Sequence, residues 1–242
     1  MKASSFKDII SGKIGDLLLS LCVRPDHQRQ MRQSTGYLSF IRENLPFLAT
    51  GALLSFLSSF GQTFFISVFG GEIREDYGLS NGEWGTIYMV GTAASAAIMV
   101  FAGGLADKFR VRTLGVIVIL FLASACLFMA FNTSVVLLPF VIFILRFTGQ
   151  GMTSHVSSVA MSRWFVAARG RALAVASLGF MLGEAALPLT MAWLKSFIEW
   201  RTLWVGFAVF CIVATLFLHR LLWIELTLQS IVEDGQTTGM FG

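Results

Sequence analysis

Six long apolar stretches, separated by short polar turns, set the pattern of this chain. A helix needs about 20 apolar residues to cross roughly 30 Å of hydrocarbon, and each stretch approaches or exceeds that length. We therefore predict an all-α polytopic membrane protein whose six transmembrane helices lie between residues 46 and 224. The predicted helices cover residues 46–69, 84–102, 113–131, 135–161, 172–194 and 202–223.

The two ends of the chain are more polar than the stretches between them. Residues 1–45 are predicted to form a cytoplasmic N-terminal segment, and residues 225–242 a cytoplasmic tail or the start of a central loop. Apolar residues recur at helical spacing near the N-terminus, which is typical of an amphipathic helix lying on the inner leaflet. A partly ordered extension agrees equally well with this pattern, so both interpretations stay open. The recurring residues are Phe6, Ile10, Ile14, Leu17, Leu18 and Leu21.

Composition and charge support the membrane assignment and orient the helices. Charged residues make up 13% of the chain, against about 25% in soluble domains. Lysine and arginine gather on the cytoplasmic side of membrane proteins. Fourteen of them lie in the N-terminal segment, in turns 103–112 and 163–171 and at the C-terminal end, whereas the alternate turns hold three. We therefore expect both termini in the cytoplasm and the protein in the plasma (inner) membrane. The net charge of +4 follows from the same bias, so no nucleic-acid partner is expected.

Two charged residues lie deep inside the predicted helices, whereas Arg220 lies near the end of the last one. At about 1.5 Å per residue, Arg146 and Glu184 both fall roughly 16–18 Å from the membrane face at which their helices enter. A mid-membrane charge costs about 3 kcal/mol on insertion scales, so such residues usually have a function. One interpretation is a substrate-anchoring arginine with a proton-titrating carboxylate. The other is a mutually neutralising pair that holds the fourth and fifth helices together, and the sequence is compatible with both.

Uncharged polar residues also recur along single helix faces. On the fourth helix, Arg146, Gln150, Thr153 and Ser157 lie within about 60° of one another, while His155 lies on the opposite side. Similar faces on the first and second helices predict a shared water-filled cavity, although serine and threonine also allow close helix packing. The candidate solute-binding or coupling residues are Arg146, Glu184, Gln150, Gln62, Ser59 and Tyr88.

Three motifs resemble those of the major facilitator superfamily, and the resemblance covers about residues 45–224. The segment Gly103-Gly104-Leu105-Ala106-Asp107-Lys108-Phe109-Arg110-Val111-Arg112 resembles the family's signature loop between its second and third helices. The segment Arg146-Phe147-Thr148-Gly149-Gln150-Gly151 resembles the fourth-helix motif, with the glutamine displaced by one position. The segment Gly179-Phe180-Met181-Leu182-Gly183-Glu184 resembles the antiporter motif of the fifth helix, with Glu184 in place of the usual proline.

The resemblance implies a fold, a partner and a function. Family members have two six-helix halves with the binding site between them, and each half consists of two inverted three-helix repeats. This chain corresponds to the first half, which implies a second six-helix half in a separate chain or a second copy, or else a truncated remnant. The family's signature loop latches against the second half and implies a conformational switch. Its candidate residues here are Gly104, Asp107, Lys108, Arg110 and Arg112.

These observations predict the N-terminal half of a secondary active transporter that moves a small organic solute by alternating access. A buried arginine favours an organic anion such as a carboxylate, because its planar fork binds two oxygens. The alternative is a non-transporting membrane interaction or assembly protein, or a truncated remnant of a transporter. No enzyme is expected, because Ser154 beside His155 lacks the Gly-x-Ser-Gly setting of an intramembrane serine protease. Cys22, Cys126 and Cys211 show no metal-ligand spacing, and neither a metal nor a cofactor is expected.

Overall fold

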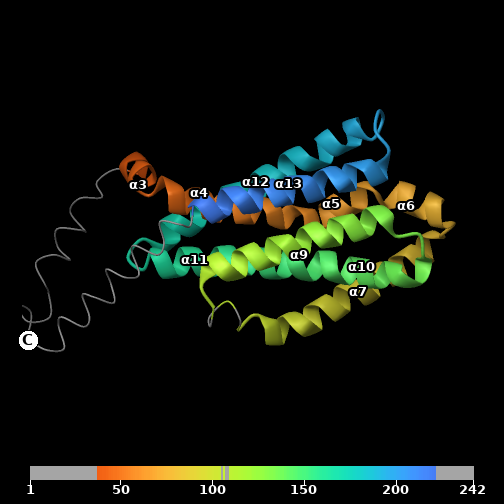
Figure 1. Cartoon of the computed structure of the whole chain (residues 1–242), viewed down its shortest axis with the longest axis horizontal. Coiled ribbons are helices and arrows are strands. Elements are labelled where there is room, and N and C mark those ends of the chain that lie inside the picture. Colours follow the sequence, from red (N-terminus) through yellow and green to blue (C-terminus); the bar gives the residue numbers. More distant parts are fainter. Residues whose placement is uncertain (1–36, 105, 107–108, 222–242) are drawn as a thin grey trace, which may run out of the picture. The chain divides into compact units, whose positions relative to one another are not determined.

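A computed structural model describes residues 37–104, 106 and 109–221, and every regular element in these ranges is a helix (Figure 1). The short helix α3 (Tyr37–Glu43) precedes a bundle of long helices. The bundle consists of α4 (Leu45–Leu57), η1 (Ser58–Gly61), α5 (Thr63–Val68), α6 (Gly70–Tyr77), α7 (Asn81–Ala102), α9 (Val111–Phe131), η2 (Val135–Leu137), α10 (Leu138–Leu145), η3 (Arg146–Thr153), α11 (Ser154–Trp164), α12 (Arg169–Leu194) and α13 (Trp200–Leu221).

The bundle has the length and the composition of a membrane domain. Five helical stretches are long and apolar enough to span a bilayer: α7, α9, α12, α13 and the continuous stretch Val135–Trp164. A shorter apolar stretch, Leu45–Gly61, begins the first of the six predicted spans. The long helices run antiparallel along one axis of the molecule (Figure 1). The prediction of an all-α membrane bundle with six spans is therefore confirmed. The amphipathic helix proposed near residues 6–21 and the tail 225–242 lie outside the described residues.

A capping box begins the second span, and a left-handed glycine ends the helix before it. The Ser80 hydroxyl accepts from the Glu83 N–H at 3.3 Å, and the Glu83 carboxylate accepts from the Ser80 N–H at 2.8 Å. This reciprocal capping satisfies two N–H groups that the first turn of α7 leaves without helical partners. Before it, Gly78 ends α6 in the left-handed conformation with φ of 63°, which glycine adopts without a Cβ penalty.

The first span is not the continuous helix that the sequence predicts over residues 46–69. It narrows to a 3₁₀ turn at η1 and breaks at Gln62, whose ψ of 155° is extended. Gly61 lies directly against Gly149 of the fourth span, and a Cβ on Gly149 would lie 2.6 Å from the Gly61 Cα. The break therefore coincides with a crossing at which the two backbones touch, a contact that hydropathy along one helix does not reveal.

The fourth span also departs from α-helical geometry at this crossing. Residues Arg146–Thr153 form a π-helix, in which hydrogen bonds run from residue i to i+5. The Thr153 hydroxyl donates to the Thr148 carbonyl, five residues earlier, at 2.6 Å. Because a π-helix holds more residues per turn than an α-helix, the residues after it face other directions than a regular helix predicts.

The arrangement of helices matches two inverted three-helix repeats. The first spans of the two repeats meet where η1 contacts η3, and the third spans meet where α9 packs along α13. Each repeat therefore contributes the equivalent helix to each of these two contacts, with opposite chain direction. An aromatic cluster fills the core between the first and sixth spans, and its members are Phe60, Phe65, Phe69, Trp204 and Phe207.

Charged and polar groups hold together the end of the bundle that contains α6. Arg201 pairs with Asp76 at 2.8 Å and donates to the carbonyls of Ala130 at 2.8 Å and Asn132 at 2.6 Å. The Tyr77 hydroxyl donates to the Asn132 carbonyl at 2.7 Å, and burial raises the pKa of this hydroxyl above its ordinary value. These bonds join α6 to the end of α9 and the start of α13.

Candidate functional site

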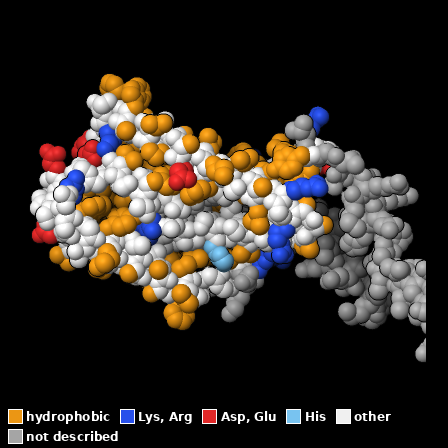
Figure 2. Space-filling model, turned by 180° about the vertical axis from the view of Figure 1, so that it is seen from behind, with side chains coloured by type: hydrophobic (Ala, Val, Ile, Leu, Met, Phe, Trp, Pro, Cys, Tyr) orange, Lys and Arg blue, Asp and Glu red, His pale blue; other side chains and the backbone are white. Residues whose placement is uncertain are grey.

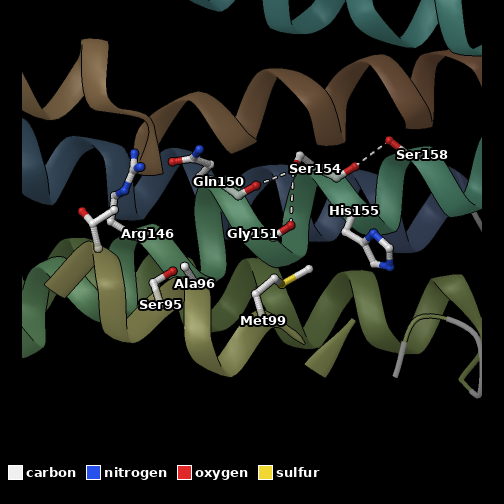
Figure 3. Close-up of a pocket in the computed structure, with 10 residues that line it drawn as sticks. Ser95, Ala96, Met99, Arg146, Gln150, Gly151, Ser154, His155 and Ser158 are labelled. Atoms are coloured by element: carbon white, nitrogen blue, oxygen red, sulfur yellow. Dashed lines mark hydrogen bonds between the residues drawn. The ribbon is translucent and has the colours of Figure 1, made fainter. Parts of the chain in front are cut away.

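A pocket of about 390 Å³ lies between the second and fourth spans (Figure 3). We call it the arginine pocket, since Arg146 is the residue in its wall that carries a permanent charge. In Figure 3 Arg146 and Gln150 lie towards one end of the pocket and His155 towards the other. Its wall consists of Thr92, Ser95, Ala96 and Met99 from α7, Arg146, Gln150 and Gly151 from η3, and Ser154, His155 and Ser158 from α11.

Arg146 is held at the break in the first span. Its side chain is buried, with 7% of the residue exposed, and Nη1 donates to the Thr63 hydroxyl at 2.9 Å and the Gly61 carbonyl at 3.3 Å. The extended conformation of Gln62 leaves the Gly61 carbonyl outside a regular helical ladder, so the guanidinium supplies a donor that this carbonyl needs. The Tyr88 hydroxyl donates to the same Thr63 oxygen at 3.1 Å, and the Tyr88 ring centroid lies 5.6 Å from the guanidinium carbon.

Three buried polar atoms around this pocket have no hydrogen-bond partner among the described residues. They are the Arg146 Nε, the Gln150 Oε1 and the Thr92 Oγ1. Buried polar groups are normally hydrogen-bonded to protein or ordered water, because an unpaired group loses its hydration without compensation. One donor and two groups able to accept are therefore available to a polar ligand or to water. A pocket of this volume also lies within the usual range for small-molecule sites, about 300–1,000 Å³.

A second pocket of about 340 Å³ lies among the first, fourth and fifth spans. We call it the serine pocket, because serine side chains dominate its wall. It shares Ser154 and Ser158 with the arginine pocket, so the two pockets adjoin along α11. Figure 2 shows a band of polar side chains and backbone between hydrophobic margins on one face of the bundle. The serine pocket is lined by Ser55, Ser58, Gln62, Ser154, Ser157, Ser158, Leu173, Ala176, Ser177 and Phe180.

The other sequence-predicted candidates are divided between these pockets and the helix contacts. Gln150 lines the arginine pocket, and Gln62 lines the serine pocket. Tyr88 contacts Arg146 and Thr63. Ser59 is fully buried against the fifth span, where its hydroxyl touches the space that a Cβ on Gly183 would occupy. Its neighbour Ser58, by contrast, lines the serine pocket.

Arg146 and Glu184 do not form the ion pair that their equal depth allows. Among the described residues, no carboxylate lies within 4.0 Å of the Arg146 guanidinium, and its hydrogen-bond partners are Thr63 and Gly61. The Glu184 side chain is exposed on α12. Depth along a helix follows from residue count, but the direction of a side chain around the helix depends on how the helices pack. The interpretation of the two as a mutually neutralising pair is therefore wrong for this conformation.

The predicted polar face of the fourth helix is also redistributed. Thr153 bonds within its own helix, and Ser157 donates to the Gly51 carbonyl at 2.8 Å. His155, expected to face away from Arg146, lines the same pocket and lies 3.0 Å from the Gly103 carbonyl. The π-helix explains these changes, since the 100° per residue used for the prediction holds only in an α-helix. Ser154 takes the place in the pocket that was assigned to Thr153.

Thr63 is a site residue that the sequence does not identify. It lies immediately after the break at Gln62, so its hydroxyl is available to receive the hydrogen bonds from Arg146 and Tyr88. A threonine in an apolar span carries no distinctive signal of its own. The preceding Gly61-Gln62 pair is the feature of the sequence that marks an interruption here, because glycine and glutamine are uncommon together inside an apolar helix.

The predicted switch loop is described only in part. Asp107 and Lys108 lie outside the described residues, whereas Gly104 and Arg110 are exposed. The flanks of the loop are bonded to two helices, α11 and α13. His155 of α11 bonds the Gly103 carbonyl, the Arg163 guanidinium donates to the Phe109 carbonyl at 3.3 Å, and Arg112 lies 3.0 Å from the His219 Nε2 of α13. The loop thus lies beside the end of the arginine pocket that contains His155.

Comparison with known proteins agrees with this architecture. A model of the Major Facilitator Superfamily matches residues 51–236, which include the second to sixth spans and most of the first. No curated protein matches the chain. Because the family match covers well over half of the chain, and the helices form the inverted repeats of this fold, the chain belongs to the major facilitator superfamily of membrane transporters.

Proposed function

We propose that this chain forms the N-terminal half of a secondary active transporter that carries a small organic anion by alternating access. The observation that carries the proposal is Arg146, a buried cation whose Nε faces no partner within the described chain. Its hydrogen bonds go to a hydroxyl and a carbonyl, which orient the guanidinium but do not neutralise it. The anionic solute would supply the missing countercharge.

The energetics favour an anion over a neutral solute at this position. A charge near the middle of a bilayer costs about 3 kcal/mol on insertion scales. A carboxylate accepting from the guanidinium would offset this cost through charge-assisted hydrogen bonds, which are roughly twice as strong as neutral ones. The unpaired Gln150 Oε1 and Thr92 Oγ1 would form hydrogen bonds with the rest of the solute or with water bound to it.

A second six-helix half would complete the binding cavity. In this superfamily the binding site lies between two such halves. The second and fifth spans expose large apolar side chains, including Val100 and Phe101 on α7 and Leu182 and Leu189 on α12. These faces suit either lipid or the helices of a partner half. We place both termini in the cytoplasm of a plasma (inner) membrane, since basic residues concentrate at the corresponding end.

Binding measurements on the full chain in lipid nanodiscs test the proposal. A panel of organic monocarboxylates and dicarboxylates, neutral amides and organic amines would be screened by the shift in melting temperature. We expect carboxylates to stabilise the protein, Arg146→Gln to abolish that shift, and Arg146→Lys to retain part of it because the charge remains but the fork is lost.

Counterflow of the bound carboxylate into proteoliposomes would then test transport. Stabilisation by amines, or a carboxylate shift that survives Arg146→Gln, would contradict the assignment. Binding without counterflow would favour the non-transporting alternative.

A further inference from the structure

The serine pocket offers acceptors of hydrogen bonds but few donors. Ser157 donates its single proton to the Gly51 carbonyl at 2.8 Å. Ser55, 2.9 Å from the Ser157 oxygen, must therefore be the donor in that contact. A serine hydroxyl has one proton and two lone pairs, so the oxygens of both residues remain able to accept from a ligand.

The other serine hydroxyls of the pocket are committed in the same way. Ser58 donates to the Ser55 carbonyl at 2.7 Å, Ser158 to the Ser154 carbonyl at 3.0 Å, and Ser177 to the Ala174 carbonyl at 2.8 Å. Ser154 donates to the carbonyls of Gln150 and Gly151. All six serine oxygens thus keep a lone pair that can accept a hydrogen bond. The side-chain amide of Gln62 makes no hydrogen bond in the described part of the chain, so this group can donate to a ligand or accept from it.

A wall of neutral acceptors selects a ligand that is rich in neutral donors. Hydroxyl groups match it directly. An ammonium group would also donate, but none of the described residues that line the serine pocket is a carboxylate, and a buried cation without a countercharge is costly. A carboxylate would meet lone pairs there, so it belongs in the arginine pocket.

The arginine pocket has the complementary property. Thr63 and Gly61 occupy Nη1 of Arg146. The edge formed by Nε and Nη2 makes no hydrogen bond with any described residue, and Nε is buried. Two parallel N–H groups on one edge of a guanidinium match the two oxygens of a carboxylate. The carboxylate site adjoins the serine pocket at Gln62, which lies between the two partners of Arg146, Gly61 and Thr63. The two pockets also share Ser154 and Ser158.

We propose that the solute is a polyhydroxylated carboxylate, with its carboxylate on the Nε–Nη2 edge of Arg146 and its hydroxyl groups donating to the serine pocket. This inference rests on the proposed anion-binding function and specifies the class of anion. It also fixes the orientation of the bound solute. The acid group lies beside Arg146 of the fourth span, and the hydroxylated carbons lie along α11 between the first and fifth spans.

Isothermal titration calorimetry of the full chain in nanodiscs tests this orientation with matched ligands. The probes are the aldonates threonate, ribonate, gluconate and galactonate, the unsubstituted alkanoates butyrate, pentanoate and hexanoate, and also sorbitol and 6-aminohexanoate. At least one aldonate should bind about tenfold more tightly than the alkanoate of equal length, since one or two added hydrogen bonds of about 1 kcal/mol each correspond to that factor. Arg146→Gln should weaken both acid series, and sorbitol should bind more weakly than gluconate.

A serine pair provides the matched control. Ser177→Ala removes one acceptor from the pocket, whereas Ser124→Ala removes an exposed serine of α9 that makes the same type of bond, to the Phe121 carbonyl at 2.7 Å. Ser177→Ala should weaken aldonate binding about fivefold and leave alkanoates unchanged, and Ser124→Ala should alter neither. Both substitutions replace exposed residues, so melting temperatures should match the parent protein.

The outcomes separate this inference from the proposed function. Alkanoates that bind as tightly as every aldonate, with both series lost in Arg146→Gln, would leave the anion site standing and overturn the hydroxyl assignment. Preference for 6-aminohexanoate, or equal effects of Ser177→Ala and Ser124→Ala, would also overturn the hydroxyl assignment. Independence of all acids from Arg146 would overturn both.

Discussion

At the scale of single residues, Arg146 connects the helix break to the candidate site. Its Nη1 bonds the carbonyl at the break, and its buried Nε has no hydrogen-bond partner among the described residues. Thr63 fixes this orientation, because its oxygen accepts from both Arg146 and Tyr88. One side chain therefore has a structural contact and a free binding edge at the same time.

Replacing Thr63 tests whether this orientation matters for binding. Thr63→Val keeps the shape of the side chain but removes the shared acceptor. We expect the carboxylate affinity measured by titration to fall about five- to tenfold, since the guanidinium is no longer held by a hydrogen bond worth about 1 kcal/mol or more. Thr86→Val is the control, because the Thr86 hydroxyl bonds only its own helix at the Gly82 carbonyl. Equal affinities of the two variants would show that Thr63 does not position Arg146.

The separation of Arg146 from Glu184 gives a second prediction at this scale. Residues without contact or shared partners contribute independently to stability, usually within about 0.5 kcal/mol. The effects of Arg146→Gln and Glu184→Gln on the free energy of unfolding, measured by SDS titration in mixed micelles, should therefore add in the double variant. A double variant clearly more stable than the sum would show that the two charges meet in the native state.

At the scale of helices, the crossing of the first and fourth spans depends on two glycines. A Cβ on Gly149 would lie 2.6 Å from both the Cα and the N of Gly61, so the backbones would have to separate. We expect Gly149→Ala to lower the free energy of unfolding by roughly 1–3 kcal/mol, as overpacking does in protein cores. The control is Gly206→Ala on α13, where a Cβ meets no atom within 4 Å and should be neutral or slightly stabilising. Equal stabilities would contradict the close crossing.

The end of the bundle that contains α6 gives a prediction about asymmetry within one ion pair. Asp76 is bonded to Arg201 alone among its measured contacts, whereas Arg201 also donates to the Ala130 and Asn132 carbonyls. Asp76→Asn should cost about 1 kcal/mol or less, as partly exposed ion pairs do. Arg201→Gln should cost about 2–3 kcal/mol, because it also leaves carbonyls at the end of α9 without their charged donor. SDS titration of both variants measures the difference, and equal costs would mean that the carbonyl contacts contribute nothing.

At the scale of the whole molecule, the basic residues predict the orientation in the membrane. The turn 132–134 follows α9 at one end of the bundle, and Gly104 follows α7 at the other end. In a Cys22→Ser background, a membrane-impermeant maleimide should label Thr133→Cys in intact cells. It should label Gly104→Cys only after permeabilisation, because the basic residues predict that this end lies in the cytoplasm. Cys126 and Cys211 are buried, so neither should react with the maleimide. The reverse pattern would place both termini outside the cytoplasm.

The candidate site could be predicted only in part. Arg146, Gln150 and Gln62 are recognisable because charged and amide side chains are costly in an apolar span and therefore conspicuous. Thr63, Ser154 and His155 were missed or set aside, since threonine and serine are common in membrane helices and the π-helix changed the direction of His155. The angular prediction assumed a regular helix over the segment where the helix is least regular.

The sequence by itself determined the number and order of the membrane helices and the distribution of charge between their ends. These properties follow from apolar length and from the count of basic residues, and both are sums over neighbouring positions along the chain. Only the tertiary structure decided where the first and fourth helices depart from α geometry, which partners Arg146 takes, and that Glu184 lies elsewhere. The first two outcomes occur where Gly61 lies against Gly149, and the third depends on how α12 packs, so all of them involve contacts between segments that are distant in sequence.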